Sequence, residues 1–314
     1  MKTAFVFPGQ GSQQVGMMRD LYEAHASVRE RFAAADDALG FSLSTLIFEG
    51  PESELVKTEF TQPAILTASV AAYDLVAAAG ERADFMAGHS LGEYSALVAA
   101  GAMDFTDAVR AVHLRGRFMQ EAVPLGEGAM AAVIRLDRDD IIAICREVSA
   151  EIGAVQAVNF NCPGQVVIAG KADAVAEAGE RMKRAGAGRI VPLAVSAPFH
   201  STLMEPAAQR LKAVLDDIEI RPPQVAVIAN VHARPVTTAQ DVRDALVEQA
   251  AHPVLWEDSV QYMRAQGLTR QVEIGPGSVL TGFMRKIDRR MEMYHVEDEA
   301  TLTDTLAKLK GAAR

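Results

Sequence analysis

Short apolar segments alternate with longer amphipathic stretches along this chain of 314 residues, and this alternation constrains the fold more than any other feature. Segments of strand length occupy residues 3–7, 83–87, 224–229 and 269–274, the first three of them mostly apolar, and each is bordered by glycine or proline. Strands separated by amphipathic helices typically form a mostly parallel sheet with helices packed on its faces. We therefore expect an α/β protein built on such a sheet.

The order of expected strands and helices changes between residues 125 and 194. The order βαββαβ expected there is typical of the ferredoxin-like fold, although these strands could instead extend the main sheet. We predict a core formed by residues 1–124 and 195–314, with a ferredoxin-like subdomain at 125–194 inserted between them. Within that subdomain we expect strands at 129–136, 155–160, 165–169 and 189–195, and helices at 138–150 and 172–185.

Composition excludes several classes of protein. The 31 basic and 41 acidic residues give a net charge of −10, which argues against binding to nucleic acid because that needs a strong positive field. The two cysteines, Cys145 and Cys162, are too few for a secreted disulfide framework. We see no signal peptide and no membrane-spanning segment, and the spacing of the seven histidines predicts no metal site. We expect a cytoplasmic protein.

The sequence Gly88-His89-Ser90-Leu91-Gly92 lies between an expected strand and an expected helix. In this context G-x-S-x-G forms a sharp turn that exposes the serine, and the flanking glycines remove side chains that would clash. The N-terminus of the following helix directs N–H groups toward the same point. Ser90 is therefore a candidate nucleophile; the alternative is a serine that only caps the helix.

A serine nucleophile needs a general base. His200 lies in a loop after an expected strand, where catalytic groups often gather, although a lone loop histidine is more often simply solvated. His89 adjoins Ser90 too closely to fold back onto it, and His113 lies within a helix. The pattern favours His200 without excluding the solvated alternative.

Several motifs together resemble the malonyl-CoA:acyl carrier protein transacylase family, in the right order over nearly the whole chain. They are Pro8-Gly9-Gln10-Gly11-Ser12-Gln13, Thr61-Gln62-Pro63-Ala64, residues 88–96, Asn159-Phe160-Asn161, residues 163–170 and Glu273-Ile274-Gly275-Pro276-Gly277. The resemblance implies a hydrolase-like α/β core with an inserted ferredoxin-like subdomain. It also implies transfer of a malonyl group from malonyl-CoA to acyl carrier protein for fatty acid synthesis, with no bound cofactor and no metal.

The resemblance also implies roles for single residues. Ser90 would carry the acyl group and His200 would be the base, oriented by the main-chain carbonyl of Gln249 rather than by an acid. The N–H groups of Gln10 and Leu91 would form the oxyanion hole. The other substrate-binding positions would be Gln10, Gln62, Met119 and Phe199; an aromatic residue at position 199 resembles malonyl-selective forms of related domains.

A malonyl group carries a free carboxylate, which a guanidinium can bind with two parallel hydrogen bonds. Among the arginines of the helix expected from Asp104, only Arg115 lies near the apolar stripe, whereas Arg110 and Arg117 lie on the far side. Arg115 also matches the carboxylate-binding arginine of the family. The alternative is a border residue whose head group reaches solvent.

Two other functions stay open: a serine hydrolase or thioesterase, and a malonyl transferase that serves polyketide synthesis. The acyl carrier protein is itself acidic, so docking would need local cations, and we expect the enzyme to be a monomer. Candidate docking residues are Lys183, Arg184, Arg189, Arg285, Lys286, Arg289 and Arg290.

Overall fold

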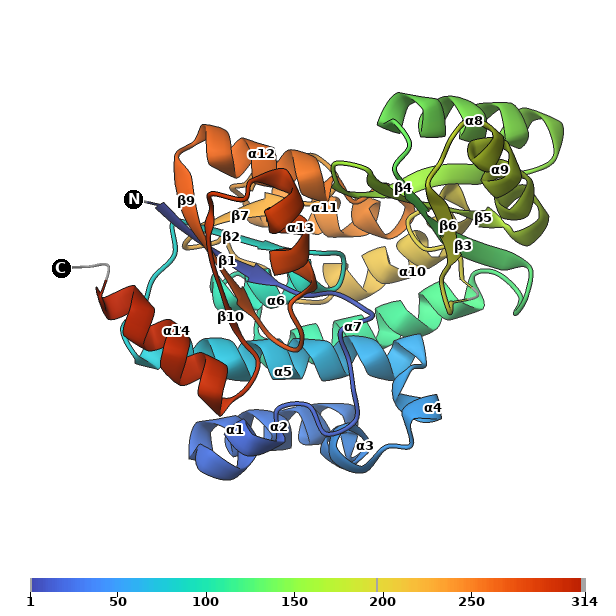
Figure 1. Ribbon diagram of the computed structural model, residues 1–314. Coiled ribbons are helices and arrows are strands. Elements are labelled where there is room, and N and C mark those ends of the chain that lie inside the picture. The colour runs from blue at the N-terminus through green and yellow to red at the C-terminus, as the bar shows by residue number, and fades with distance from the viewer. Residues whose placement is uncertain (1, 196, 312–314) are drawn as a thin grey trace.

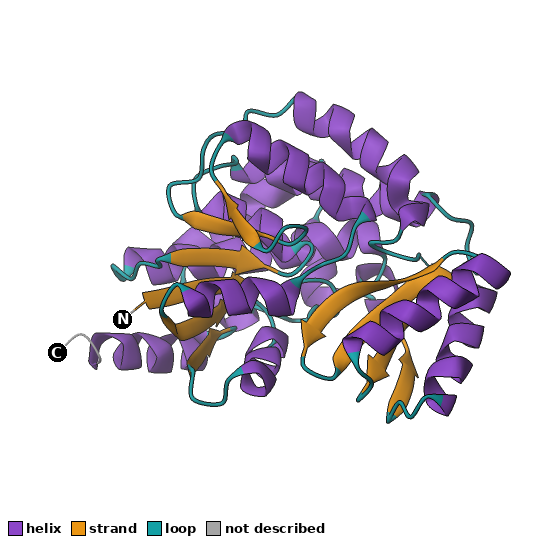
Figure 2. Ribbon diagram, turned by 90° about the horizontal axis from the view of Figure 1, so that it is seen from above, coloured by secondary structure: helices purple, strands orange, loops and turns teal. Residues whose placement is uncertain are grey.

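The protein contains two separate β-sheets, each with its own covering of helices (Figures 1 and 2). The structure is a computed structural model, and it describes residues 2–195 and 197–311. The N- and C-terminal parts of the chain both contribute to the larger sheet, and the smaller sheet is formed between them in the sequence. Within the described residues, no helix is both long enough and apolar enough to span a lipid bilayer.

The larger sheet has six strands in the order β10-β9-β1-β2-β7-β8. The first five run parallel to one another, and β8 pairs with β7 in the antiparallel sense. The buried strand β1 lies between β2 and β9, and it runs parallel to β2, so the loops that follow β1 and β2 begin side by side. The strands are β1 (Lys2–Phe7), β2 (Phe85–Gly88), β7 (Ala226–Ala229), β8 (Arg234–Val236), β9 (Leu268–Ile274) and β10 (Glu292–Val296).

Helices cover both faces of this sheet (Figure 1). They are α1 (Arg19–Ala24), α2 (Ala26–Leu39), α3 (Leu43–Glu49), α4 (Glu52–Leu55), α5 (Thr58–Ala78), α6 (Gly92–Ala99), α7 (Phe105–Glu121), the 3₁₀ helix η1 (Thr202–Met204), α10 (Glu205–Asp216), α11 (Ala239–Ala251), α12 (Trp256–Ala265), α13 (Val279–Ile287) and α14 (Glu299–Gly311).

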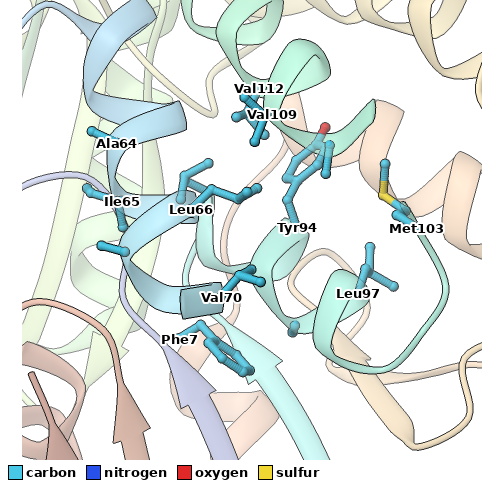
Figure 3. Packing of buried hydrophobic residues seen from close by; sticks show 14 of the residues in the cluster. Phe7, Ala64, Ile65, Leu66, Val70, Tyr94, Leu97, Met103, Val109 and Val112 are labelled. Carbon is cyan, nitrogen blue, oxygen red and sulfur yellow. The ribbon is translucent and has the colours of Figure 1, made fainter. Parts of the chain in front are cut away.

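The helices α5, α6 and α7 pack closely on one another through small and branched apolar side chains. Leu66 and Val70 of α5 lie near Tyr94 and Leu97 of α6 and near side chains of α7 (Figure 3). Gly116 permits the close approach of α7 to α5, because a Cβ there would lie 2.5 Å from the carbonyl oxygen of Thr58. This approach brings the middle of α7 to the point where α6 begins.

The smaller sheet is antiparallel, with the order β4-β5-β3-β6. Two helices cover one face of it, and a compact apolar core fills the space between (Figure 2). Its elements are β3 (Gly128–Ile134), α8 (Arg138–Glu151), β4 (Val155–Cys162), β5 (Gln165–Lys171), α9 (Ala172–Arg184) and β6 (Arg189–Pro192). This is the predicted βαββαβ arrangement, so the predicted fold class, a mostly parallel core with a ferredoxin-like insertion, is confirmed.

Backbone hydrogen bonds tie the two sheets together. The N–H of Phe160 donates to the carbonyl of Val254 at 2.9 Å, and the N–H of Val254 donates to the carbonyl of Val158 at 2.8 Å. The segment that follows α11 therefore adds to the edge of β4. This contact holds the small sheet against the end of the large one where β1 and β2 finish.

Two strands of the large sheet were not expected, and one strand of the small sheet is shorter than expected. Both β8 and β10 lie at sheet edges and are partly exposed, so they lack the continuous apolar run that marks a buried parallel strand. The strand expected at 189–195 ends at Pro192, and the chain then leaves the sheet. Its mostly exposed residues are also typical of an edge strand.

Candidate active site

Ser90 occupies the sharp turn between β2 and α6. Its φ of 52° lies in the left-handed region, which is unusual for a residue with a side chain and typical of a nucleophile elbow. The flanking glycines are required by space: a Cβ on Gly88 would overlap the backbone of Gly92, and a Cβ on Gly92 would overlap the carbonyl of Phe7. The G-x-S-x-G sequence therefore folds as the turn that it predicts.

His200 is the base that the geometry offers to Ser90. Its Nε2 lies 2.8 Å from the Ser90 Oγ, and its Nδ1 lies 2.7 Å from the carbonyl oxygen of Gln249. A carbonyl can only accept, so Nδ1 carries the proton and Nε2 is free to accept from the serine hydroxyl. Burial lowers the pKa of His200 to about 3, helped by the positive charge of Arg115, so the imidazole is neutral at physiological pH.

Arg115 projects from α7 into the same site, where it is only 1% exposed. Its Nη2 donates to the Ser90 Oγ at 3.1 Å and to the Gln249 Oε1 at 2.7 Å. Its Nη1 donates to the Gln62 Oε1 at 2.8 Å. Arg110 and Arg117 are exposed, so the helical periodicity correctly distinguished the inward-facing arginine from the other two.

The loop after β1 lies against the serine turn. Gly9 is required there, because a Cβ would overlap the carbonyl of His89. Gln10 follows it, and its side chain donates to the Thr58 Oγ1 at 3.2 Å. In the described part of the chain, no acceptor contacts the main-chain N–H of Gln10 or of Leu91. Two free N–H groups beside a serine are the donors that an oxyanion hole needs.

A cavity of about 100 Å³ opens onto Ser90. Its lining combines a few polar groups with apolar walls: Gln10, Gln62, His89, Ser90, Arg115, Met119, Met130, Asn159, Leu193, Val195, Phe199 and His200. The structure thus brings together in one cavity the side chains that were expected to act on or bind substrate: Gln10, Gln62, Ser90, Arg115, Met119, Phe199 and His200. A larger cavity of about 420 Å³ shares Val195 with it and extends past Lys57, Thr58 and Arg117.

Comparisons with known proteins agree with this arrangement. Residues 4–303 match the family model described as an acyl transferase domain. The chain is 54% identical over 285 residues to the malonyl CoA-acyl carrier protein transacylase of Escherichia coli K12, covering 90% of this chain and 92% of that protein. It is 48% identical over 309 residues to the enzyme of the same name from Bacillus subtilis, covering 98% of each chain. The chain belongs to the malonyl-CoA:acyl carrier protein transacylase family.

Solved structures of the malonyl-CoA:acyl carrier protein transacylase family superpose on the chain. An acyl carrier protein S-malonyltransferase from Vibrio cholerae gives a TM-score of 0.95 at 48% identity, covering 97% of this chain and 100% of that one. A malonyl-transacylase in complex with a type II polyketide synthase acyl-carrier protein gives 0.96 at 49% identity, covering 98% and 100%. The family recognised from the motifs and the predicted enzyme class, a malonyl transferase, are confirmed.

Sequence reasoning missed two residues that surround this transacylase site. Glu93 lies one helical turn after Ser90, and Asn230 follows β7; both are buried and hydrogen-bonded to the serine turn or to its neighbours. Glu93 was visible as the acid within the family motif at residues 88–96. No sequence pattern indicated a role for Asn230, because its contacts depend on how β7 pairs with β2.

Proposed function

We propose that this enzyme transfers a malonyl group from malonyl-CoA to the phosphopantetheine thiol of acyl carrier protein through an acyl-enzyme on Ser90, supplying fatty acid synthesis. One observation carries the proposal. The Ser90 Oγ lies within hydrogen-bond distance of both a neutral histidine and a buried guanidinium. The histidine fits a base that activates the serine, and the guanidinium fits a carboxylate on the acyl group that the serine receives.

The first half-reaction uses His200 as base and then as acid. His200 Nε2 takes the Ser90 proton as Oγ attacks the thioester carbonyl carbon, and the N–H groups of Gln10 and Leu91 stabilise the oxyanion. Collapse of this intermediate breaks the C–S bond, and the departing CoA sulfur takes the proton from His200. The second half-reaction reverses these steps, with the carrier's thiol as nucleophile.

Arg115 would bind the free carboxylate of the malonyl group. Gln62 and Gln249 each accept one hydrogen bond from its guanidinium, so the planar fork is held in place before substrate arrives. Met119 and Phe199 are buried walls of the cavity that limit the size of the acyl group. The larger cavity beside Lys57 and Arg117 offers space for the pantetheine arm.

A serine hydrolase is the alternative within enzymes, and the hydrogen bond at His200 Nδ1 argues against it. Most lipases and esterases of this fold orient the histidine with a carboxylate, whereas here a main-chain carbonyl does so. A hydrolase of uncharged esters would also present no carboxylate for the buried Arg115 beside Ser90 to bind. Release of CoA from malonyl-CoA distinguishes the two: it should be slow alone and rise at least tenfold with carrier protein, and Ser90→Ala should abolish it. Equal release with and without the carrier would contradict transferase function.

The carrier would dock on cations near α13. Arg285 and Arg289 are exposed with no ion-pair partner among the described residues, and Lys286 reaches across to the Gln165 Oε1 on β5. By contrast, Lys183, Arg184 and Arg290 each pair with a nearby acid, Glu180, Glu177 and Asp288 respectively. Arg189 is exposed on β6, without an ion pair to any described residue. The docking set therefore centres on Arg285, Lys286 and Arg289.

Charge reversal tests this docking surface. The double substitution Lys286→Glu and Arg289→Glu should raise the KM for the carrier several-fold and leave the KM for malonyl-CoA nearly unchanged. Lys183→Glu with Arg184→Glu is the matched control, because their charges are already balanced locally. An equal effect of both pairs, or none, would exclude docking at α13.

The enzyme's assembly, location, domain boundaries and acceptor also belong to this proposal. We propose that the enzyme works as a monomer in the cytoplasm, without nucleic-acid or membrane partners and without a bound cofactor or metal. Residues 1–124 and 195–314 would form the catalytic core, with 125–194 as a subdomain; residue 196, close to the second boundary, lies outside the described residues. A polyketide carrier is a second candidate acceptor, because one similar transacylase was solved with such a carrier.

A further inference from the structure

Glu93 is a buried acid beside the site that the proposed reaction does not use. It lies in the first turn of α6 and is 1% exposed. Its Oε2 accepts two hydrogen bonds, one from the Gln249 Nε2 and one from the backbone N–H of Asn230, each at 2.9 Å. Acids are almost never buried to this extent unless a partner compensates the charge.

The side chain of Gln249 connects this acid to Arg115. Its Oε1 accepts from the Arg115 Nη2 at 2.7 Å, while its Nε2 donates to Glu93 and also to the carbonyl of Ser90 at 2.9 Å. A guanidinium can only donate and a carboxylate can only accept. The two charges therefore fix which end of the Gln249 amide faces each of them, and one amide group separates the charges.

Asn230 connects the same acid to the nucleophile. Its side-chain Oδ1 accepts from the N–H of Ser90 at 2.7 Å, and its Nδ2 donates to the carbonyl of Gly88 at 2.7 Å. Asn230 thus clamps the strained turn from both sides, and Glu93 holds the backbone of Asn230. A change at Glu93 would therefore affect the position of Ser90 through Asn230 and the position of Arg115 through Gln249.

The charge of this buried cluster depends on Glu93 and Arg115. Gln249 from α11 and Asn230 after β7 are uncharged. Burial raises the pKa of the Tyr94 phenol on α6, and His200 is neutral, so neither changes charge near pH 7. Burial raises the pKa of Glu93 to about 7, opposed by its hydrogen bonds and by the Arg115 charge. Glu93 can therefore gain or lose a proton in the working range.

We propose that Glu93 is the buried counter-charge of Arg115 and a positioning residue for malonyl transfer, and that it takes up a proton from solvent when the malonyl carboxylate binds Arg115. A carboxylate bound to Arg115 and the Glu93 carboxylate, one amide group away from that guanidinium, repel each other in a buried site, and protonation of one relieves this. The new O–H forms on Oε1, which has no hydrogen-bond partner among the described residues, so both bonds to Oε2 persist. The inference rests on the proposed function, in which Arg115 binds that carboxylate.

The variant Glu93→Gln removes the charge of Glu93 while keeping the hydrogen bonds that its side chain accepts. A glutamine oxygen at the place of Oε2 can accept both hydrogen bonds, so the variant loses only the charge. In the wild type, kcat/KM for malonyl-CoA should fall as the pH rises above 7, approaching about tenfold per unit, because each binding event needs a proton. In Glu93→Gln it should stay level within about twofold, as it should for acetyl-CoA in both enzymes.

Glu273→Gln is the matched control. Glu273 is fully buried on β9 and its pKa is likewise raised by burial to about 7, but it accepts from the N–H groups of Leu280 and Thr281. This variant should keep the wild-type fall in kcat/KM. Thermal melting of each variant establishes that it is folded.

Calorimetry of malonyl loading in two buffers of different ionisation enthalpy gives a second readout. At pH 8 the wild type should take up about one proton per malonyl group, and Glu93→Gln about none. A fall in kcat/KM with rising pH that persists in Glu93→Gln, or malonyl loading of the wild type without proton uptake, would overturn the inference. The measurement of proton uptake needs only the wild type, so it tests the inference even if the variant does not fold. If malonyl-CoA does not acylate wild-type Ser90 at all, the proposed function itself fails.

Discussion

His200 should lower the free energy of unfolding of the enzyme in acid. A variant without this histidine should therefore lose less stability than the wild type as the pH falls. The fold lowers the pKa of His200 from 6.5 to about 3, chiefly by burial and then by the charge of Arg115. The unfolded chain therefore binds a proton below pH 6.5 that the folded chain does not bind. This part of the stability is complete above pH 6.5 and is lost as the pH falls toward 3.

The size of the effect follows from the shift. At pH 5, which is 1.5 units below the ordinary pKa, protonation of the unfolded chain costs the wild type about 2 kcal/mol of unfolding free energy. His200→Gln does not carry this cost. The difference in unfolding free energy between wild type and variant should therefore change by about 2 kcal/mol, in favour of the variant, between pH 8 and pH 5.

Urea denaturation followed by circular dichroism measures this difference. Because every other titrating group is common to both proteins, its contribution cancels in the comparison. The difference should be constant between pH 8 and pH 9, where His200 is neutral in both states, and this provides an internal control. A difference that stays constant down to pH 5 would refute the assignment of His200 as a buried neutral base.

Two further predictions concern the turn and the cysteines. Gly92→Ala should destabilise the protein by about 3 kcal/mol or more in urea denaturation, because its Cβ would overlap the Phe7 carbonyl, whereas Gly282→Ala in open space should be neutral or slightly stabilising. Burial raises the pKa of Cys145 to about 12 and that of Cys162 to about 11, so iodoacetamide at pH 8 should label both thiols much faster in urea than in the native enzyme. Equal labelling rates would show that the thiols are accessible.

The parts of the fold that the sequence predicted are those with a strong local signal. The buried parallel strands β1 and β2 are short, mostly apolar runs that end beside proline or glycine, and the strands β3 and β5 of the small sheet are also rich in apolar residues. Arg115 was distinguishable because helical periodicity alone sets the direction in which it points. Edge strands such as β10 carry no such signal, because one side faces solvent and the pattern becomes mixed.

The site was predictable only in part, for a similar reason. Ser90 and His200 lie in loops whose sequences indicate a nucleophile and a base, but the motifs alone did not establish that their side chains meet. Their contact depends on the packing of α11, which places the carbonyl of Gln249 behind the imidazole. Glu93 and Asn230 depend on pairing between segments more than 130 residues apart in the chain, and no local pattern contains that information.

The central claim is that Ser90 receives the malonyl group and Arg115 selects it by its carboxylate. Rapid acid quenching after mixing the enzyme with equal amounts of malonyl-, methylmalonyl- and acetyl-CoA, followed by peptide mass spectrometry, tests this directly. The wild type should carry malonyl on the peptide that contains Ser90, with little acetyl. Arg115→Ala should lose the malonyl adduct and retain acetyl loading. An adduct on another residue, or an equal loss of malonyl and acetyl loading in the variant, would contradict the account.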